Sequence, residues 1–264
     1  MDPSSHKRYH LHEWQPLGMF NKYFSGTVEK YITEEVVRFP IEQIYKVAGQ
    51  GQITGECLID LSVGPAIYHL LPIFEFFKDI TILEFNDFCV KELKEWKNKE
   101  SESYDWTHAL AIMAELQGTS FKGNEMENAL RRSISHILKC DFTKETFTEQ
   151  FFLPKADCVL SMYVLHLVSD HEDDYSRNLK KVSGMLKLGG HLLLFGLFNA
   201  KYYTIGESKF HLLATDKKSV EDIMREAGFV IELLEVKESK MRDDTTYLEQ
   251  FYFIKALKKS NAFV

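Results

Sequence analysis

Three acidic residues stand at the ends of apolar runs that predict β-strands, and together they could bind a ligand. Asp60 lies in a run that begins at Cys57, Glu84 follows Ile80–Leu83, and Asp141 closes a third, shorter run. Because the carboxyl ends of parallel strands share one edge of a sheet, we expect the three carboxylates to gather there. One carboxylate can accept two hydrogen bonds from a ribose diol, and another can accept one from an adenine amine. Three carboxylates repel a pyrophosphate, so the pattern favours an adenosyl ligand of little negative charge.

The turn after the first strand has the position of a nucleotide-binding loop, although its glycine signal is weak. Ser62-Val63-Gly64 leads directly into a helical pattern, and no Walker-type lysine follows it. Gly64 precedes Glu84 by about 20 residues, the length of a strand-helix-strand unit. Taken alone, a plain strand-to-helix turn explains this loop about as well as a ligand cradle does.

Alternating strands and helices must position these residues. Apolar runs predict strands at 57–62, 80–84, 137–142, 156–164, 191–198, 230–236 and 251–257. Helical periodicity predicts helices within 28–47 and at 67–77, 88–97, 107–116, 125–138, 175–185 and 219–227, with a loop or hairpin at 199–214. The last two strands have no helix between them, which indicates an antiparallel edge. The pattern therefore predicts an α/β fold with a mostly parallel sheet.

Composition excludes several classes of protein. The chain has 264 residues, 45% of them hydrophobic and 27% charged, which is typical of a globular protein. Its formal net charge of -7 argues against a nucleic-acid partner. The four cysteines have no metal-type spacing, so we expect reduced thiols and no metal. No apolar run is long enough to span a bilayer, and we expect a cytoplasmic monomer that does not bind a membrane.

The chain is expected to form one compact unit with two parts. Residues 1–50 would supply a lid and helices that pack on the core, and residues 51–264 would form the main domain. The first 25 residues are rich in aromatic side chains, such as Trp14 and Phe20. Such a segment either packs on the domain or folds over a site, and packing alone is the commoner case.

A set of short motifs makes the resemblance to a known family specific. It comprises Leu58-Ile59-Asp60, Gly64-Pro65, Ile67-Tyr68, Leu93 with Trp96, Tyr104-Asp105-Trp106, Leu138–Asp141 with Thr143, Ala156–Leu160, Leu186-Lys187, Gly189-Gly190, Tyr202-Tyr203, Ile205-Gly206, Lys209-Phe210 and Glu226–Gly228. In this order they resemble the small-molecule methyltransferases that include nicotinamide, indolethylamine and phenylethanolamine N-methyltransferases. The resemblance implies a Rossmann-like class I fold and S-adenosyl-L-methionine as cofactor.

The resemblance also implies roles for individual residues. Cofactor contacts would fall on Tyr23, Phe24, Asp60, Ser62, Gly64, Tyr68, Glu84, Phe85, Asp141, Phe142 and Met162. Substrate contacts would fall on Met19, Tyr163, His166, Gly196, Phe198, Tyr203 and Leu212. His166 is the candidate base if an amine must lose a proton, although a core histidine satisfied by its neighbours is the commoner situation.

Departures from the family pattern bear on activity. The usual glycine-serine-glycine turn is Ser62-Val63-Gly64, the aspartate after the second strand is Glu84, and the asparagine after it is Cys89. Gly196 aligns with the aspartate that nicotinamide methylation uses, so we expect a larger, more apolar acceptor than nicotinamide.

Three hypotheses follow. The leading one is a methyltransferase for a small amine or related nucleophile, which transfers the methyl group by in-line displacement with positioning and desolvation as the main sources of rate. The second is a family member that has lost catalysis and acts by binding. The third, a nicotinamide-dependent oxidoreductase, is disfavoured because the loop lacks repeated glycines.

Overall fold

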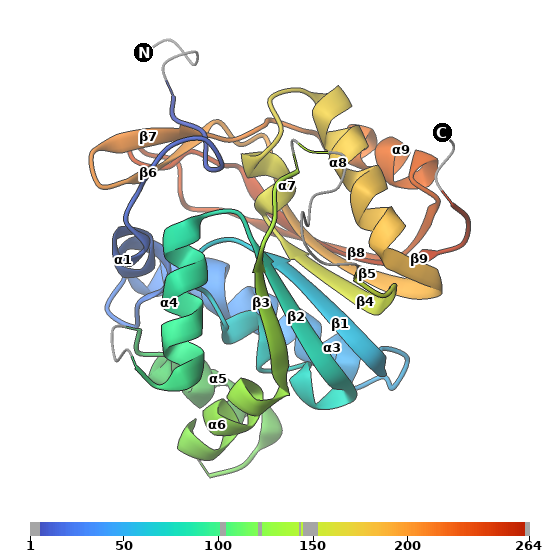
Figure 1. The fold of residues 1–264 in the computed structure, drawn as a ribbon. Coiled ribbons are helices and arrows are strands. Elements are labelled where there is room, and N and C mark those ends of the chain that lie inside the picture. The colour runs from blue at the N-terminus through green and yellow to red at the C-terminus, as the bar shows by residue number, and fades with distance from the viewer. Residues whose placement is uncertain (1–5, 101–103, 121–122, 143, 145–152, 262–264) are drawn as a thin grey trace.

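A computed structural model describes residues 6–100, 104–120, 123–142, 144 and 153–261. Its centre is a seven-stranded sheet with the strand order β3-β2-β1-β4-β5-β9-β8, and a separate two-stranded hairpin is formed by β6 and β7 (Figure 1). The strands are β1 (Gly55–Ser62), β2 (Phe77–Glu84), β3 (Ile134–Lys139), β4 (Ala156–Met162), β5 (Leu186–Phe198), β6 (Tyr202–Ile205), β7 (Ser208–His211), β8 (Phe229–Glu238) and β9 (Gln250–Lys258).

The sheet is parallel except at one edge, as the sequence predicts. Strands β1 to β5 pair in parallel, whereas β9 pairs antiparallel with both β5 and β8. Strand β1 is fully buried from Leu58 onward, which explains the continuous apolar run around Asp60. The chain order reverses between β1 and β4, so the carboxyl ends of these two strands flank the switch point at which ligands of open α/β sheets bind.

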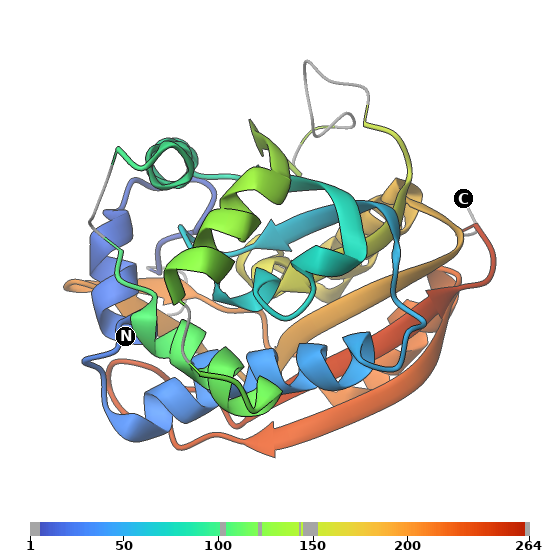
Figure 2. The same ribbon diagram turned by 90° about the horizontal axis from the view of Figure 1, so that it is seen from below.

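Helices cover both faces of the sheet. Those with regular α geometry are α1 (Pro16–Met19), α2 (Lys30–Ile32), α3 (Phe39–Ala48), α4 (Asp87–Asn98), α5 (Thr107–Gln117), α6 (Gly123–Ser133), α7 (Val164–Leu167), α8 (Glu172–Met185) and α9 (Lys217–Glu226). Helices α3, α5 and α6 lie below the sheet in Figure 1, and Figure 2 shows them from that side; α8 and α9 lie above it. No helix in the described ranges is long and apolar enough to cross a membrane.

The N-terminal part of the chain is more ordered than its composition suggests. Helix α1 continues into a π-helical turn η2 (Phe20–Phe24), and α2 continues through a second one, η3 (Thr33–Arg38), into α3. Val37, Ile41 and Ile44 are fully buried with the core of the sheet. Residue Lys7 forms a parallel bridge to Phe210 of the β6–β7 hairpin, which holds the start of the described chain beside that hairpin.

Several predicted boundaries are wrong. The helix expected at 67–77 is absent; only the 3-10 turns η4 (Tyr68–Leu70) and η5 (Phe74–Phe76) form, because Pro72 lacks the N–H that a helix needs. The strand expected at 191–198 begins at Leu186. The helix expected at 125–138 ends at Ser133, and the third strand begins at once at Ile134 rather than at 137. The described cysteines are all free thiols, as expected.

Candidate functional site

The predicted cofactor residues meet at the carboxyl edge of the sheet. Ser62 at the end of β1 lies in register with Met162 at the end of β4, and Met162 lies in register with Phe195 of β5. The turn after β1 needs its glycine, because Gly64 has a φ of 74° and a Cβ there would lie 3.0 Å from the sulfur of Met19. The N-terminal segment therefore packs directly on the loop that the sequence assigns to the cofactor.

Asp60 is fully buried behind this loop and is satisfied within the chain. The hydroxyl of Ser62 donates to its Oδ1 at 2.5 Å, and Nε2 of His69 lies 2.9 Å from its Oδ2. Tyr68 is buried as well, and its hydroxyl donates to the carbonyl of Val36 at 2.8 Å. These groups therefore stabilise the loop, and their polar atoms face other parts of the chain.

Glu84 at the end of β2 is bound by a residue that the sequence analysis did not single out. The hydroxyl of Tyr9 lies 2.9 Å and 3.0 Å from the two carboxyl oxygens of Glu84, and the Gly64 N–H donates to that hydroxyl at 2.9 Å. The backbone N–H groups of Phe85 and Asn86 donate to Oε1 at 2.6 Å and 2.8 Å. The carboxyl group expected to hold the ribose thus holds Tyr9 in this structure.

Burial raises the pKa of Glu84 to about 8, and the hydrogen bonds from Asn86, Tyr9 and Phe85 oppose that rise only in part. The pKa of the Tyr9 hydroxyl is raised as well, first by burial and then by the nearby carboxyl of Glu84. No cation is among the causes of either shift. The centre of this edge is a buried pair of groups that is mostly neutral near pH 7.

The aromatic residues expected near adenine contact each other. The rings of Phe85 and Phe142 stack with centroids 5.1 Å apart and planes 22° apart. Asp141 beside them is partly exposed, and the ammonium of Lys144 lies 3.8 Å from it. A hollow of about 160 Å³ lies outside this stack, lined by the segment from Tyr9 to Glu13 and by Phe85 to Phe88.

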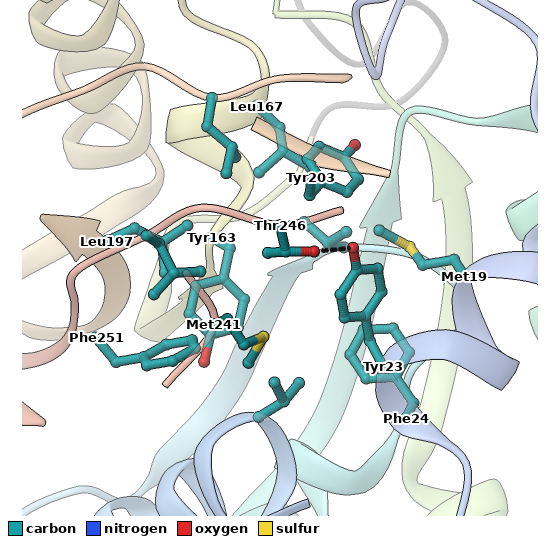
Figure 3. Close-up of a pocket in the computed structure, with 14 residues that line it drawn as sticks. Met19, Tyr23, Phe24, Tyr163, Leu167, Leu197, Tyr203, Met241, Thr246 and Phe251 are labelled. Carbon is teal, nitrogen blue, oxygen red and sulfur yellow. Dashed lines mark hydrogen bonds between the residues drawn. The ribbon is translucent and has the colours of Figure 1, made fainter. Parts of the chain in front are cut away.

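A second cavity of about 70 Å³ lies on the other side of the loop and is lined by four of the seven predicted substrate residues (Figure 3). It is lined by Met19, Tyr23, Phe24, Val36, Val63, Tyr163, Leu167, Leu197, Tyr203, Leu212, Met241, Thr246, Leu248 and Phe251. None of these described lining residues carries a charge. For comparison, a cavity of about 150 Å³ is needed to hold benzene, so this cavity must widen before an aromatic molecule can enter.

The surface of this cavity is apolar, and the hydroxyls of three lining tyrosines and of Thr246 are buried behind it. The hydroxyl of Tyr23 is used, since it donates to the carbonyl of Thr204 at 3.0 Å and lies 2.8 Å from the hydroxyl of Thr246. The hydroxyls of Tyr163 and Tyr203 are buried without a hydrogen-bond partner among the described residues. Tyr163 also has a left-handed backbone with a φ of 62°, which is strained for a residue of its size. Buried polar atoms without partners are costly, so these two hydroxyls are the groups best placed to bind a ligand.

His166 lies under the cavity wall and is absent from its described lining. The Leu197 N–H donates to Nε2 at 3.1 Å, which places the ring proton on Nδ1, 3.1 Å from the carbonyl of Leu213. The hydroxyl of Tyr252 lies 3.1 Å from the same Nε2. Burial lowers the pKa of His166 to about 4, so the ring is neutral near pH 7. Its hydrogen bonds position β5 and the segment at Leu213, and a role as a base stays a prediction.

Gly196 and Phe198 also face this network. A Cβ at Gly196 would lie 2.1 Å from the phenol of Tyr252 and 2.6 Å from Nε2 of His166, so Tyr252 fills the space of a side chain at 196. Phe198 stacks on Tyr252 with centroids 4.3 Å apart. The structure thus places Met19, Tyr163, Tyr203 and Leu212 at the cavity, together with Tyr23 and Phe24, which were assigned to the cofactor. It places His166, Gly196 and Phe198 behind it.

Sequence reasoning missed Tyr9, Tyr252 and the residues from 241 to 251 that line the cavity. A glycine inside a buried strand signals the close approach of another group, so Gly196 could have indicated a neighbour such as Tyr252. No local pattern points to Tyr9. Groups of three or more His, Cys, Asp or Glu side chains placed to hold a metal are absent from the described part of the chain.

Comparison with known proteins places the chain in a family. A family model described as the NNMT/PNMT/TEMT family matches residues 4–259. The chain is 33% identical over 230 residues to nicotinamide N-methyltransferase of Homo sapiens, with 87% of each chain covered. It is 36% identical over 219 residues to indolethylamine N-methyltransferase of Oryctolagus cuniculus, with 83% of each covered.

Solved structures show the same fold at much lower identity. The N-methyltransferase NodS of Bradyrhizobium japonicum, in complex with S-adenosyl-L-homocysteine, superposes with a TM-score of 0.56 at 9% identity, over 94% of this chain and 100% of that chain. A likeness at this identity shows the fold of S-adenosylmethionine-dependent methyltransferases and no more. The family match spans nearly the whole chain, and we conclude that this protein is a member of the NNMT/PNMT/TEMT family.

Proposed function

We propose that the protein is an S-adenosyl-L-methionine-dependent N-methyltransferase whose acceptor is a small, apolar, uncharged molecule. The observation that carries this proposal is the cavity beside the loop after β1, whose described lining holds no charge and presents an apolar surface, with two phenol hydroxyls without partners buried behind it. The family supports the type of reaction, and the lining supports the type of acceptor. Nicotinamide is not the acceptor that we propose, since the space at Gly196 is filled by Tyr252.

The residues fit the cofactor in chemical type but are engaged with each other. Glu84 could accept from ribose hydroxyls, Asp141 could accept from the adenine amine, and the Gly64 N–H could donate to the ligand. In this structure the Tyr9 hydroxyl is hydrogen-bonded to both the Glu84 carboxyl and the Gly64 N–H, and Phe85 stacks on Phe142. The donor set therefore suits an adenosyl ligand once these contacts open.

Within that site the chain would position the acceptor and exclude water. The cofactor, when bound, supplies an electrophilic methyl group. Tyr163 and Tyr203 would orient a polar atom of the acceptor, which is the positioning on which such a reaction mainly depends. The apolar side chains of Leu197, Leu212 and Phe251 would exclude water from the reacting nitrogen.

The lining also explains why no strong base is needed. A carboxylate beside an amine would keep it protonated, and protonation removes the lone pair that must attack the methyl group. No acidic side chain is among the described residues of the lining. A neutral aromatic amine would therefore enter already in its reactive form, and the methylated nitrogen would lose its proton to water after release.

The test begins with calorimetric titration of the purified protein with S-adenosyl-L-methionine and S-adenosyl-L-homocysteine. Binding would justify mass-spectrometric detection of methyl transfer to a panel that contrasts neutral aromatic amines with nicotinamide and with permanently cationic amines. We expect transfer to the neutral class. Replacement Tyr163→Phe should raise KM more than it lowers kcat, because the hydroxyl positions the acceptor.

A second candidate function, a family member that binds without catalysis, is favoured by the loop itself. Ser62 directs its hydroxyl to Asp60, and Val63 lines the cavity where a small polar residue is usual in the family. Replacing Ser62 by Gly and Val63 by Ser tests this reading. A large gain in affinity for the cofactor would show that the natural loop is impaired, whereas unchanged affinity would favour the enzyme.

A further inference from the structure

The hydroxyl of Tyr9 is hydrogen-bonded to the Glu84 carboxyl and to the Gly64 N–H, two groups that could bind a cofactor. The hydroxyl of Tyr9 accepts from the Gly64 N–H at 2.9 Å and lies 2.9 Å and 3.0 Å from the oxygens of Glu84. Glu84 is completely buried, and Tyr9 is 1% exposed. A ribose hydroxyl would need the same carboxyl oxygens, so it cannot bind while Tyr9 is in place.

Tyr9 belongs to a segment that we name the strap, residues 6–14. At its start the Lys7 N–H donates to the Lys209 carbonyl at 2.9 Å, and the His211 N–H donates to the Lys7 carbonyl at 2.9 Å. Within the strap the ring of Trp14 packs on Tyr9 with centroids 5.0 Å apart, and the chain continues into α1 at Pro16. The strap thus pairs with β7 and runs beside the β6–β7 hairpin toward α1 (Figure 1).

We propose that Tyr9 is a built-in competitor of the cofactor, and that the strap must release it before the adenosyl group can bind. This inference rests on the proposed function, since it concerns access to the same cofactor site. The strap then acts as an autoinhibitory contact. Affinity for the cofactor depends on how easily the strap opens as well as on the contacts that the cofactor makes.

The adenine and substrate parts of the site are also closed in this structure. The Phe85 and Phe142 rings stack directly on each other, and the substrate cavity of about 70 Å³ is smaller than a cavity of about 150 Å³ that holds benzene. Oε1 of Glu84 already accepts from the N–H groups of Phe85 and Asn86. Tyr9 covers the second oxygen, and Glu84 has no exposed surface while Tyr9 is in place, which is why the strap and the ribose exclude each other.

The test compares the affinity of the full-length protein and its variants for S-adenosyl-L-homocysteine by calorimetry. Tyr9→Phe keeps the ring and removes the competing hydroxyl, and Tyr9→Ala removes both. Tyr45→Phe is the matched control, since Tyr45 lies on α3 at a separate hollow beside Leu71 and Met113. We expect both Tyr9 variants to bind about tenfold more tightly than the natural protein, a change of about 1.4 kcal/mol, and Tyr45→Phe to bind as the natural protein does.

Hydrogen exchange supplies a readout that does not involve activity. If Tyr9 is a competitor, the ligand should speed exchange at the amides of Lys7 and His211, whereas a strap that closes over the ligand would slow it. Equal or weaker binding by Tyr9→Phe and Tyr9→Ala would overturn the inference while leaving cofactor binding intact. Failure of every protein, Tyr9→Ala included, to bind at millimolar ligand would overturn the proposed function itself. Binding by Tyr9→Ala alone would support the inference in its strongest form.

Discussion

Gly196 has no side chain, and the phenol of Tyr252 lies in the space that a side chain there would need. Alanine at this position would place a methyl group 2.1 Å from the phenol of Tyr252, so Gly196→Ala should lower the free energy of unfolding by about 1–3 kcal/mol through overpacking. Urea denaturation followed by circular dichroism measures this change. Gly184→Ala is the matched control, because an added Cβ meets nothing within 4 Å there. On helix α8 that control should be neutral or stabilising by up to about 1 kcal/mol; equal loss in both variants would contradict the prediction.

Glu84 should make opening of the strap depend on pH. Its pKa is about 8 in the closed state and near its ordinary value of 4.5 when water reaches it, so opening releases a proton between these values. The closed state is therefore most stable below about pH 4.5 and weakens as pH rises toward 8, by up to about tenfold per pH unit, with no further change above. The groups that face Glu84 are Tyr9, Cys89, Cys140 and Tyr203, whose pKa values are all raised, so none of them ionises in this range.

Exchange rates of the Lys7 and His211 amides, corrected for the intrinsic effect of pH, measure this dependence. The corrected opening constant should rise from pH 5 to 8 in the natural protein and stay level in Glu84→Gln, which cannot ionise. A slope that persists in Glu84→Gln would assign the effect to another group.

At the scale of elements, the N-terminal turn η2 is linked to the hairpin strand β6 by the Tyr23 phenol and by the Lys22 ammonium, which donates to the Thr204 hydroxyl. The Tyr23 hydroxyl donates to the Thr204 carbonyl, accepts from the Thr204 N–H at 3.2 Å and contacts Thr246. Tyr23→Phe leaves these groups unpaired, and we expect it to lower the free energy of unfolding by about 1–3 kcal/mol. Tyr45→Phe, whose hydroxyl makes no such link, should change it by less than about 0.5 kcal/mol. Similar values for the two variants would show that the link is not stabilising.

The sequence predicts elements well wherever a local pattern decides them. The buried run around Asp60 predicts β1, and the absence of a helix between the last two strands predicts the antiparallel edge formed by β8 and β9. The helix expected at 67–77 fails because Pro72 divides it, and the third strand begins three residues early because α6 ends at Ser133.

In the candidate site, too, some residues can be predicted from the sequence and others cannot. The strand tips that carry Asp60 and Glu84 follow from periodicity, and the cavity residues Tyr163 and Tyr203 follow from the family resemblance. The contact between Tyr9 and Gly64 joins positions 55 residues apart, and that between Tyr9 and Glu84 joins positions 75 apart. No local period encodes such a pair, so only the folded structure shows that the site is closed by its own chain.

At the scale of the whole molecule, the expected division into residues 1–50 and 51–264 stays a prediction, and we expect residues 1–50 to respond to denaturant in two parts. Residues 16–48 bury Val37, Ile41 and Ile44 in the main core, and we expect them to unfold with the sheet. The strap before them has few backbone hydrogen bonds to the rest of the protein, and Leu11 within it is 65% exposed. Sparse burial and few hydrogen bonds are the properties of a segment that opens locally before the protein unfolds.

Tryptophan fluorescence can separate the two events, because the chain has three tryptophans in different places. Trp14 is packed against Tyr9 in the strap, whereas Trp106 packs in the core against Phe20 with centroids 5.1 Å apart. In a Trp96→Phe/Trp106→Phe variant, the fluorescence of Trp14 should change at a lower urea concentration than circular dichroism does. In the matched Trp14→Phe/Trp96→Phe variant, Trp106 should report the same midpoint as circular dichroism. Coincident midpoints for both reporters would mean that the strap opens only when the whole protein unfolds, and a cofactor could then reach Glu84 only at the cost of the entire fold.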